Sequence, residues 1–144
     1  MRWLGLDLGE RRIGIAVSDP LGVTAQGVSV YERKGGQRQE AEFFRNLFHT
    51  YEVGEVILGL PKNMNGSEGP AAEKARSFGE WLANEFGIAV SFWDERLSTS
   101  SAQQVMLAAD LSRRKRKDKI DQLAAVIILQ NYLDFRRRQM ERAD

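Results

Sequence analysis

The chain has 144 residues, 42% of them hydrophobic and 28% charged, with a formal net charge of +1, as expected for a single soluble globular domain. It contains no cysteine and one histidine, His49, which excludes disulfides, thiolate zinc sites and histidine-rich metal sites and indicates a reducing compartment. No stretch approaches the roughly 20 apolar residues of a membrane span, and no long apolar run precedes Asp7, so we expect neither a membrane protein nor a signal peptide.

The first half of the chain predicts three strands and a helix. Residues 2–8 and 13–19 are apolar runs typical of strands, and the short turn between them contains Gly9, whose conformational freedom suits a hairpin. Alternating apolar residues predict a third strand over residues 23–31. Residues 37–51 carry apolar side chains at helical spacing and are predicted to form a helix.

The second half alternates strands with helices. It reads, in order, as strand 55–60, helix 70–86, strand 88–93, helix 98–110 and helix 120–135. Residues 112–119 (SRRKRKDK) are too polar to pack and are predicted to form a solvated loop. This order predicts an α/β fold with a mixed five-stranded sheet, antiparallel over its first three strands, and helices packed on it. We expect one domain over residues 1–138 and a C-terminal tail over residues 139–144.

Asp7 interrupts an otherwise apolar strand. An ionised carboxylate in a central strand is costly unless another group pairs with it. One interpretation is an edge position or an ion pair with Arg11 or Arg12. The other is a functional role, and the strand by itself does not separate the two.

Asp94 and Glu95 follow the last predicted strand. Loops at strand ends often carry function, although a solvated end with a local ion pair is the simpler interpretation. Adjacent residues in a strand point to opposite faces, so only one of the two carboxylates can share a face with Asp7. The sequence pattern does not decide which one.

Two further acids, Asp118 and Asp121, lie at the start of the last predicted helix. They suit an N-cap and a first helical turn, where the helix dipole favours acids. A functional interpretation rests on geometry, because Asp121, Ala125 and Ile128 lie near one line along the helix. The small Ala125 would let this helix approach the sheet and bring Asp121 to the strand that carries Asp7.

Together these acids predict an oxygen-only metal site. Carboxylates brought close together repel one another, and a divalent cation offsets that repulsion. Oxygen ligands without His or Cys suit Mg²⁺ or Mn²⁺. Two such ions about 4 Å apart would clamp the attacking water and the leaving oxygen of a phosphodiester. The pattern therefore predicts a metal-dependent nuclease.

Basic residues near these acids are candidates for binding the phosphate backbone. The basic run, Arg113-Arg114-Lys115-Arg116-Lys117, directly precedes the acidic helix start. It is either a solvated loop or a segment that attracts phosphates and makes binding salt-dependent. Lys62 and Asn63 follow a predicted strand and could also lie at the active face.

Four segments of the sequence resemble motifs of the YqgF/RuvX family. They begin at Asp7 (DLGERRIGIA), Gly59 (GLPKNMNGSEG), Asp94 (DERLST) and Asp121 (DQLAAVIILQ). Four motifs in this order, over nearly the whole chain, are far more specific than any one of them. The resemblance implies a ribonuclease H-like fold, in the superfamily of the resolvase RuvC. It also implies a cytoplasmic bacterial protein with divalent-metal nuclease activity.

The family is described both as pre-16S rRNA nucleases and as Holliday junction resolvases. The resemblance implies that Asp7, Glu95 (or Asp94) and Asp121 are the first, second and third metal ligands, with Asp118 as a further candidate. It also implies that Arg12 or Arg96 contacts phosphate. The expected substrate is structured RNA, such as the 5′ end of pre-16S rRNA, with branched DNA as the alternative.

Two other functions are compatible with parts of the pattern. A nucleotide-binding module of the actin and sugar-kinase type also opens with Asp-x-Gly on a hairpin, but it needs two related halves, and this chain has the length of one. A non-catalytic factor that binds ribosomal RNA would use the basic run equally well. Junction resolvases generally act as two-fold dimers. The sequence leaves monomer and homodimer open.

Overall fold

The computed structural model describes residues 1–97 and 117–143, and for residues 117–121 and 143 it describes the backbone only. The elements are β1 (Arg2–Leu8), β2 (Arg12–Ser18), β3 (Ala25–Glu32), α1 (Gln37–Thr50), β4 (Val53–Leu60), α2 (Pro70–Phe86), β5 (Ala89–Asp94), the 3₁₀ turn η1 (Glu95–Leu97) and α4 (Lys117–Ala143). None of the described helices is long and apolar enough to cross a membrane.

The five strands form one mixed sheet in the order β3-β2-β1-β4-β5. The β1–β2 and β2–β3 pairs are antiparallel, whereas β1–β4 and β4–β5 are parallel. This arrangement confirms the predicted mixed five-stranded sheet. It also places β1 at the centre, so the interpretation of Asp7 as an edge residue is wrong.

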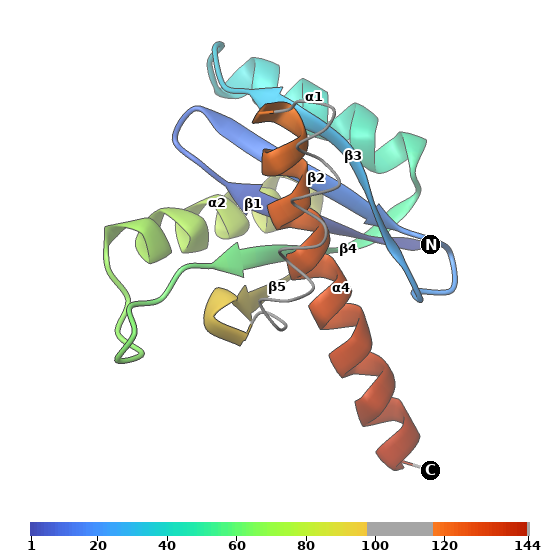
Figure 1. Ribbon diagram of the computed structural model, residues 1–144. Helices are drawn as coiled ribbons and strands as arrows, with labels where there is room; N and C mark the ends of the chain where they lie inside the picture. The colour runs from blue at the N-terminus through green and yellow to red at the C-terminus, as the bar shows by residue number, and fades with distance from the viewer. Residues whose placement is uncertain (98–116, 144) are drawn as a thin grey trace.

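Helices cover both faces of the sheet. Figure 1 shows α4 crossing in front of the strands, with α1 and α2 behind them. Alternation along β1 divides its side chains between two cores: Leu4 and Leu6 belong to the core under α1 and α2, and Trp3 packs against the core under α4. The apolar groups of both faces are thereby removed from water, which is the main favourable term in folding.

Helix α4 lies unusually close to β1, at Gly5. A Cβ atom at this position would lie 2.7 Å from the Cβ of Leu129 and 3.0 Å from the carbonyl oxygen of Ala125. A second attachment comes from Gln130, whose side-chain oxygen accepts a hydrogen bond from the Ala25 N–H at 2.9 Å and whose amide donates to the Val23 carbonyl at 2.9 Å. The position of α4 on the sheet is therefore fixed at the centre and at the β3 edge.

Element boundaries differ from the prediction by one or two residues in several places, and the start of β3 and the ends of α4 are the informative cases. β3 begins two residues later than predicted, because the Asp19 carboxylate accepts hydrogen bonds from the N–H groups of Val23 (2.7 Å) and Thr24 (2.9 Å) and holds them in a turn. α4 is longer than the predicted helix 120–135 at both ends.

At both ends, α4 includes residues that the sequence analysis assigned to a loop or to the C-terminal tail. The loop prediction for residues 117–119 is wrong, because the helix already includes them. At the other end, residues 136–143 (RRRQMERA) are mostly strong helix formers and continue the helix past residue 138, although they are largely exposed. The predicted helix 98–110 and the rest of the predicted loop lie outside the described residues.

Candidate metal centre

Asp7 lies on the α4 side of the central strand. The odd-numbered positions of β1 face α4, since Trp3 packs against that core and Gly5 lies under Leu129. Asp7 comes next on this face, close to the C-terminal end of the strand, and is partly exposed. Its partner in β2 is Gly14, which has no side chain. No side chain therefore stands directly opposite Asp7 on β2.

Glu95 reaches the same place from the other side of β4. It follows β5 in η1, and its Oε2 atom lies only 2.7 Å from where a Cβ at Gly59 would stand. Gly59 belongs to β4, the strand between β5 and β1. Burial, followed by the charges of Asp7 and Asp94, raises the pKa of Glu95 to about 7. The carboxylates of Asp7 and Glu95 are thus close enough to repel each other.

Asp94 is held by a neighbouring guanidinium. Its Oδ1 accepts hydrogen bonds from the Arg96 backbone N–H at 2.9 Å and from Nε at 3.1 Å, and Oδ2 accepts from the terminal nitrogen at 2.7 Å. The hydrogen bond from Arg96 is the main reason why the pKa of Asp94 lies below its usual value. Of the two acids between which the sequence could not choose, Glu95 is therefore the one whose carboxylate approaches Asp7 over β4.

The third expected acid comes from α4. Residue 121 lies in this helix one turn before Ala125, whose backbone packs on Gly5. The side chains of Asp118 and Asp121 lie outside the described residues. Among the side chains that the structure does describe, no group of three or more His, Cys, Asp or Glu could hold a metal ion.

The described carboxylates nevertheless suit a hard divalent cation. Both offer oxygen donors, which Mg²⁺ and Mn²⁺ prefer. Glu95 is desolvated and also repelled by the charge of Asp7, and a cation bound between the two would reverse that repulsion into attraction. Gly14 lies beside Asp7 and Gly59 lies beside Glu95, and neither glycine has a side chain that would occupy the space next to the carboxylate.

Gly59 was not singled out by sequence reasoning as part of the site. Its Cβ would meet not only Glu95 but also the Cδ1 of Ile128, at 2.6 Å. A signal was present, because a glycine inside the apolar run EVILGL marks a place where another group approaches the backbone closely. That signal did not say which group would approach.

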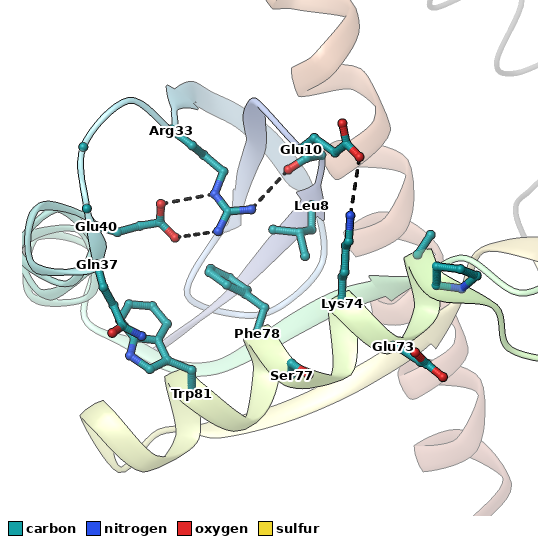
Figure 2. A pocket seen from close by; sticks show the side chains of 15 residues that line it. Leu8, Glu10, Arg33, Gln37, Glu40, Glu73, Lys74, Ser77, Phe78 and Trp81 are labelled. Carbon is teal, nitrogen blue, oxygen red and sulfur yellow. Dashed lines mark hydrogen bonds and ion pairs between the residues drawn. The ribbon is translucent and has the colours of Figure 1, made fainter.

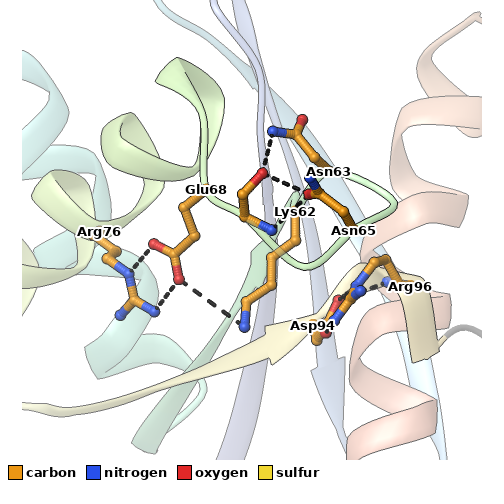
Figure 3. Close-up of polar contacts among 8 residues, drawn as sticks. Lys62, Asn63, Asn65, Glu68, Arg76, Asp94 and Arg96 are labelled. Atoms are coloured by element: carbon orange, nitrogen blue, oxygen red, sulfur yellow. Dashed lines mark hydrogen bonds and ion pairs between the residues drawn. The ribbon is translucent and has the colours of Figure 1, made fainter.

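The residues expected to contact nucleic acid lie on different elements, and part of the basic run lies outside the described residues. Arg12 begins β2 on the face that carries Asp7, two positions from Gly14. Lys62 and Asn63 lie in the loop of residues 61–69, which joins β4 to α2 and is drawn in Figure 3. The Lys62 ammonium lies 4.0 Å from the Glu68 carboxylate, and Asn63 is exposed. Of the basic run, residues 113–116 and the Lys117 side chain lie outside the described residues.

A cavity of about 1170 Å³ lies on the other face of the sheet, between the N-terminal ends of α1 and α2. Figure 2 shows Arg33 and Lys74 at this cavity. The Arg33 guanidinium is paired with Glu40 at 3.0 Å, and the Lys74 ammonium lies 3.4 Å from the carboxylate of Glu10. Because carboxylates neutralise both cations, this cavity is a poor site for phosphate, and Asp7 lies on the opposite face.

Comparison with known proteins identifies one family. The model of the RuvX family, described as Holliday junction resolvase, matches residues 1–135. A protein from Pelotomaculum thermopropionicum is 48% identical over 99% of this chain and 93% of its own. One from Syntrophomonas wolfei is 53% identical over 93% of this chain and 94% of its own. Both bear the name "Putative pre-16S rRNA nuclease".

Solved structures of two DNA-junction enzymes have the same fold. RuvC of T. thermophilus, in complex with a Holliday junction substrate, superimposes with a TM-score of 0.61 and 14% identity over 96% of both chains. The Holliday junction resolvase of fowlpox virus gives a TM-score of 0.55 and 14% identity over 94% of this chain and 99% of its own. These likenesses confirm the predicted ribonuclease H-like fold.

Proposed function

Because the chain belongs to the RuvX family, whose model spans residues 1–135, we propose that it is a metal-dependent nuclease that processes the 5′ end of pre-16S rRNA. Relatives about 50% identical over nearly the whole chain bear the name of a pre-16S rRNA nuclease. The observation that carries the proposal is the approach of the Glu95 carboxylate to Asp7 across the bare backbone of Gly59. A cytoplasmic location follows from a ribosomal RNA substrate.

The proposed metal ligands are Asp7, Glu95 and Asp121, and they would hold two Mg²⁺ or Mn²⁺ ions. Bound divalent ions would supply an activated water and would offset the charge that develops on the phosphodiester. Asp7 provides oxygen donors from a rigid central strand, and Glu95 provides them from the turn after β5. Asp121 would bring a third carboxylate from α4, and Asp118 is a further candidate on the same helix.

Binding of the nucleic acid is assigned to cations near this face. Arg12 lies beside the site on β2, and the loop 61–69 brings Lys62 and Asn63 to the C-terminal end of β4. The basic run directly precedes α4 in the sequence. Its charges would attract the phosphate backbone and supply most of the affinity, because phosphate contacts dominate nucleic-acid binding.

Cleavage of branched DNA is the second candidate function. It is favoured by the description of the family model as a Holliday junction resolvase. A four-way junction has two-fold symmetry, so this activity calls for a homodimer, whereas processing of an RNA end is compatible with a monomer.

The decisive experiment compares a precursor 16S rRNA leader with a four-way DNA junction as substrates, in Mg²⁺ and in Mn²⁺. We expect cleavage of the RNA, and we expect Asp7→Asn to abolish it while RNA affinity is retained. Glu73→Gln is the matched control, because Glu73 is an exposed acid on α2, on the other face of the sheet.

Three results would change the assignment. Cleavage of the junction alone would establish the second candidate function. RNA binding without cleavage of either substrate would identify a non-catalytic assembly factor. Unchanged cleavage by Asp7→Asn would show that the metal site is elsewhere.

A further inference from the structure

Arg96 directs all three of its guanidinium nitrogens toward the protein. Nε and one terminal nitrogen bind the Asp94 carboxylate, at 3.1 Å and 2.7 Å, and the other terminal nitrogen donates to the Met64 carbonyl at 3.3 Å. Asp94 is 15% exposed and Arg96 39% exposed. Planar, two-point pairing of this kind fixes geometry more strictly than a single contact between charges.

Met64 belongs to the loop 61–69, which has a defined shape of its own. The Asn63 N–H donates to the Ser67 carbonyl at 2.9 Å, and the Asn65 side-chain oxygen accepts from the Ser67 N–H at 3.0 Å. Gly66 adopts φ +90°, a conformation that favours glycine, and lies beside the Arg96 guanidinium. Arg96 therefore contacts a preformed turn.

The other end of this loop is anchored to α2. Glu68 accepts two hydrogen bonds from Arg76, at 2.6 Å and 2.7 Å. Figure 3 shows the two ion pairs, Glu68 with Arg76 and Asp94 with Arg96, on either side of the loop. The loop is thus attached to α2 through one guanidinium and to the end of β5 through the other.

In the sequence, Glu95 lies between Asp94 and Arg96, the two partners of the second of these ion pairs. Its carboxylate occupies a narrow place, because a single added carbon at Gly59 would come within 2.7 Å of it and within 2.6 Å of Ile128. Any rotation of η1 would move this carboxylate relative to Asp7. Asp94 ends β5 and Arg96 lies within η1, so their ion pair and the bond from Arg96 to Met64 tie η1 to β5 and to the loop 61–69 and oppose such a rotation.

We propose that Asp94, Arg96 and the loop 61–69 form a clip that sets the position of Glu95, so that Asp94 and Arg96 are positioning residues rather than a metal ligand and a phosphate contact. The inference rests on the proposed function, because it takes Glu95 as a metal ligand. It replaces the two alternatives from the sequence, in which Asp94 is a metal ligand and Arg96 contacts phosphate.

The test uses Arg96→Lys, Asp94→Asn and the double variant. Lysine keeps the charge but loses the planar fork. We expect each single variant to weaken Mn²⁺ binding in calorimetry by about 10- to 100-fold, as for other groups that orient a ligand. We expect kcat to fall by about 10- to 100-fold. The double variant should be no worse than either single one, because both remove the same interaction.

Two further measurements separate positioning from direct contact. Amide hydrogen exchange of residues 63–67 should accelerate in all three variants. The affinity for RNA and its salt dependence should stay unchanged, because no phosphate contact is lost. Arg33→Lys is the matched control: it alters a similar two-point pair with Glu40 on the other face of the sheet, and it should leave Mn²⁺ binding and exchange of the loop unaffected.

Each alternative role has its own signature. If Arg96→Lys weakens RNA binding and lowers the salt slope by about one while exchange in the loop is unchanged, Arg96 is a phosphate contact and the clip is refuted. If Asp94→Asn abolishes Mn²⁺ binding but Arg96→Lys does not, Asp94 is itself a ligand. If the wild-type protein cuts no nucleic acid, the proposed function fails, while Mn²⁺ binding and amide exchange still decide whether the clip exists.

Discussion

At the scale of single residues, the site depends on glycines, which have no side chain, as much as on acids. Gly14 stands beside Asp7 in the sheet, and Gly59 lies beneath the carboxylate of Glu95. Neighbouring strands are about 4.8 Å apart, so acids attached to β1 and to the end of β5 are separated by a whole strand. A side chain at position 59 would fill the space through which Glu95 approaches Asp7.

The raised pKa of Glu95 makes the stability of the metal-free protein depend on pH. In the unfolded chain Glu95 ionises near 4.5, whereas in the folded protein it holds its proton up to a pH of about 7. Below pH 4.5 both states are protonated and there is no effect. As pH rises from about 5 to about 8, the free energy of unfolding should fall by about 1–3 kcal/mol.

Urea denaturation in the presence of a chelator, at pH 5 to 8, measures this effect. Glu95→Gln should flatten the profile and stabilise the metal-free protein at pH 8, whereas Glu73→Gln should change neither. An unchanged profile in Glu95→Gln would show that another group titrates in this range. In Mn²⁺, the ion displaces the proton, so the affinity for metal should rise with pH through about 7.

At the scale of elements, the placement of α4 decides whether a third acid can reach the sheet. The helix lies on Gly5 at the centre and is tied to the β3 edge by Gln130. Its packing residues, including Ala125, Ile128 and Leu129, form the core on this face. The N-terminal turns that contain Asp118 and Asp121 are continuous with this packed segment.

Gly5→Ala should therefore disturb both stability and the metal site. The new methyl group would meet Leu129 at 2.7 Å and the backbone of Ala125 at 3.0 Å, and overpacking of this kind costs about 1–3 kcal/mol. Because α4 must shift away from β1, Mn²⁺ affinity should also fall. Urea denaturation and calorimetry measure the two effects.

Gly36→Ala is the control for this substitution, because nothing lies within 4 Å of its new methyl group. Gly36 is the N-cap of α1, where alanine is less favoured than glycine, so its replacement should cost no more than about 1 kcal/mol and leave Mn²⁺ binding intact. Equal destabilisation by the two variants would argue against a close contact at Gly5.

At the scale of the whole molecule, positive charge is distributed unevenly. Residues 111–144 hold 10 of the 21 Lys and Arg residues but only 5 of the 20 Asp and Glu. At the large cavity on the α1 and α2 side, Arg33 and Lys74 are both neutralised by carboxylates. The nucleic acid is therefore expected to approach from the face of α4, guided by the basic run.

Replacing the basic run by five glutamines should weaken RNA binding and make it less sensitive to salt. Each lost phosphate contact lowers the slope of log K against log salt by about 0.7–0.9. Binding titrations between low and moderate salt measure this slope. The control is the double variant Arg33→Gln, Lys74→Gln, which removes two cations that are paired with carboxylates on the opposite face. If its salt slope falls as much as that of the five-glutamine variant, the opposite face binds RNA.

The sequence by itself determined the elements and the family. Apolar periodicity is a local property, so it located every described strand and α-helix, with errors at boundaries such as those of β3 and α4. The acids, the absence of cysteine and the four family motifs predict an oxygen-only metal site. The confirmed sheet and family follow from these patterns.

Only the tertiary structure decided which of Asp94 and Glu95 approaches Asp7. Local pattern places the two acids on opposite faces of a strand end but cannot say what each face meets. The answer depends on Gly59, more than 30 residues earlier in the chain, and on the fork of Arg96 bound to Met64 in another loop. Such contacts depend on how distant segments pack. The position of each carboxylate is set by the space and the hydrogen-bond partners around it, and residues far away in the sequence provide both.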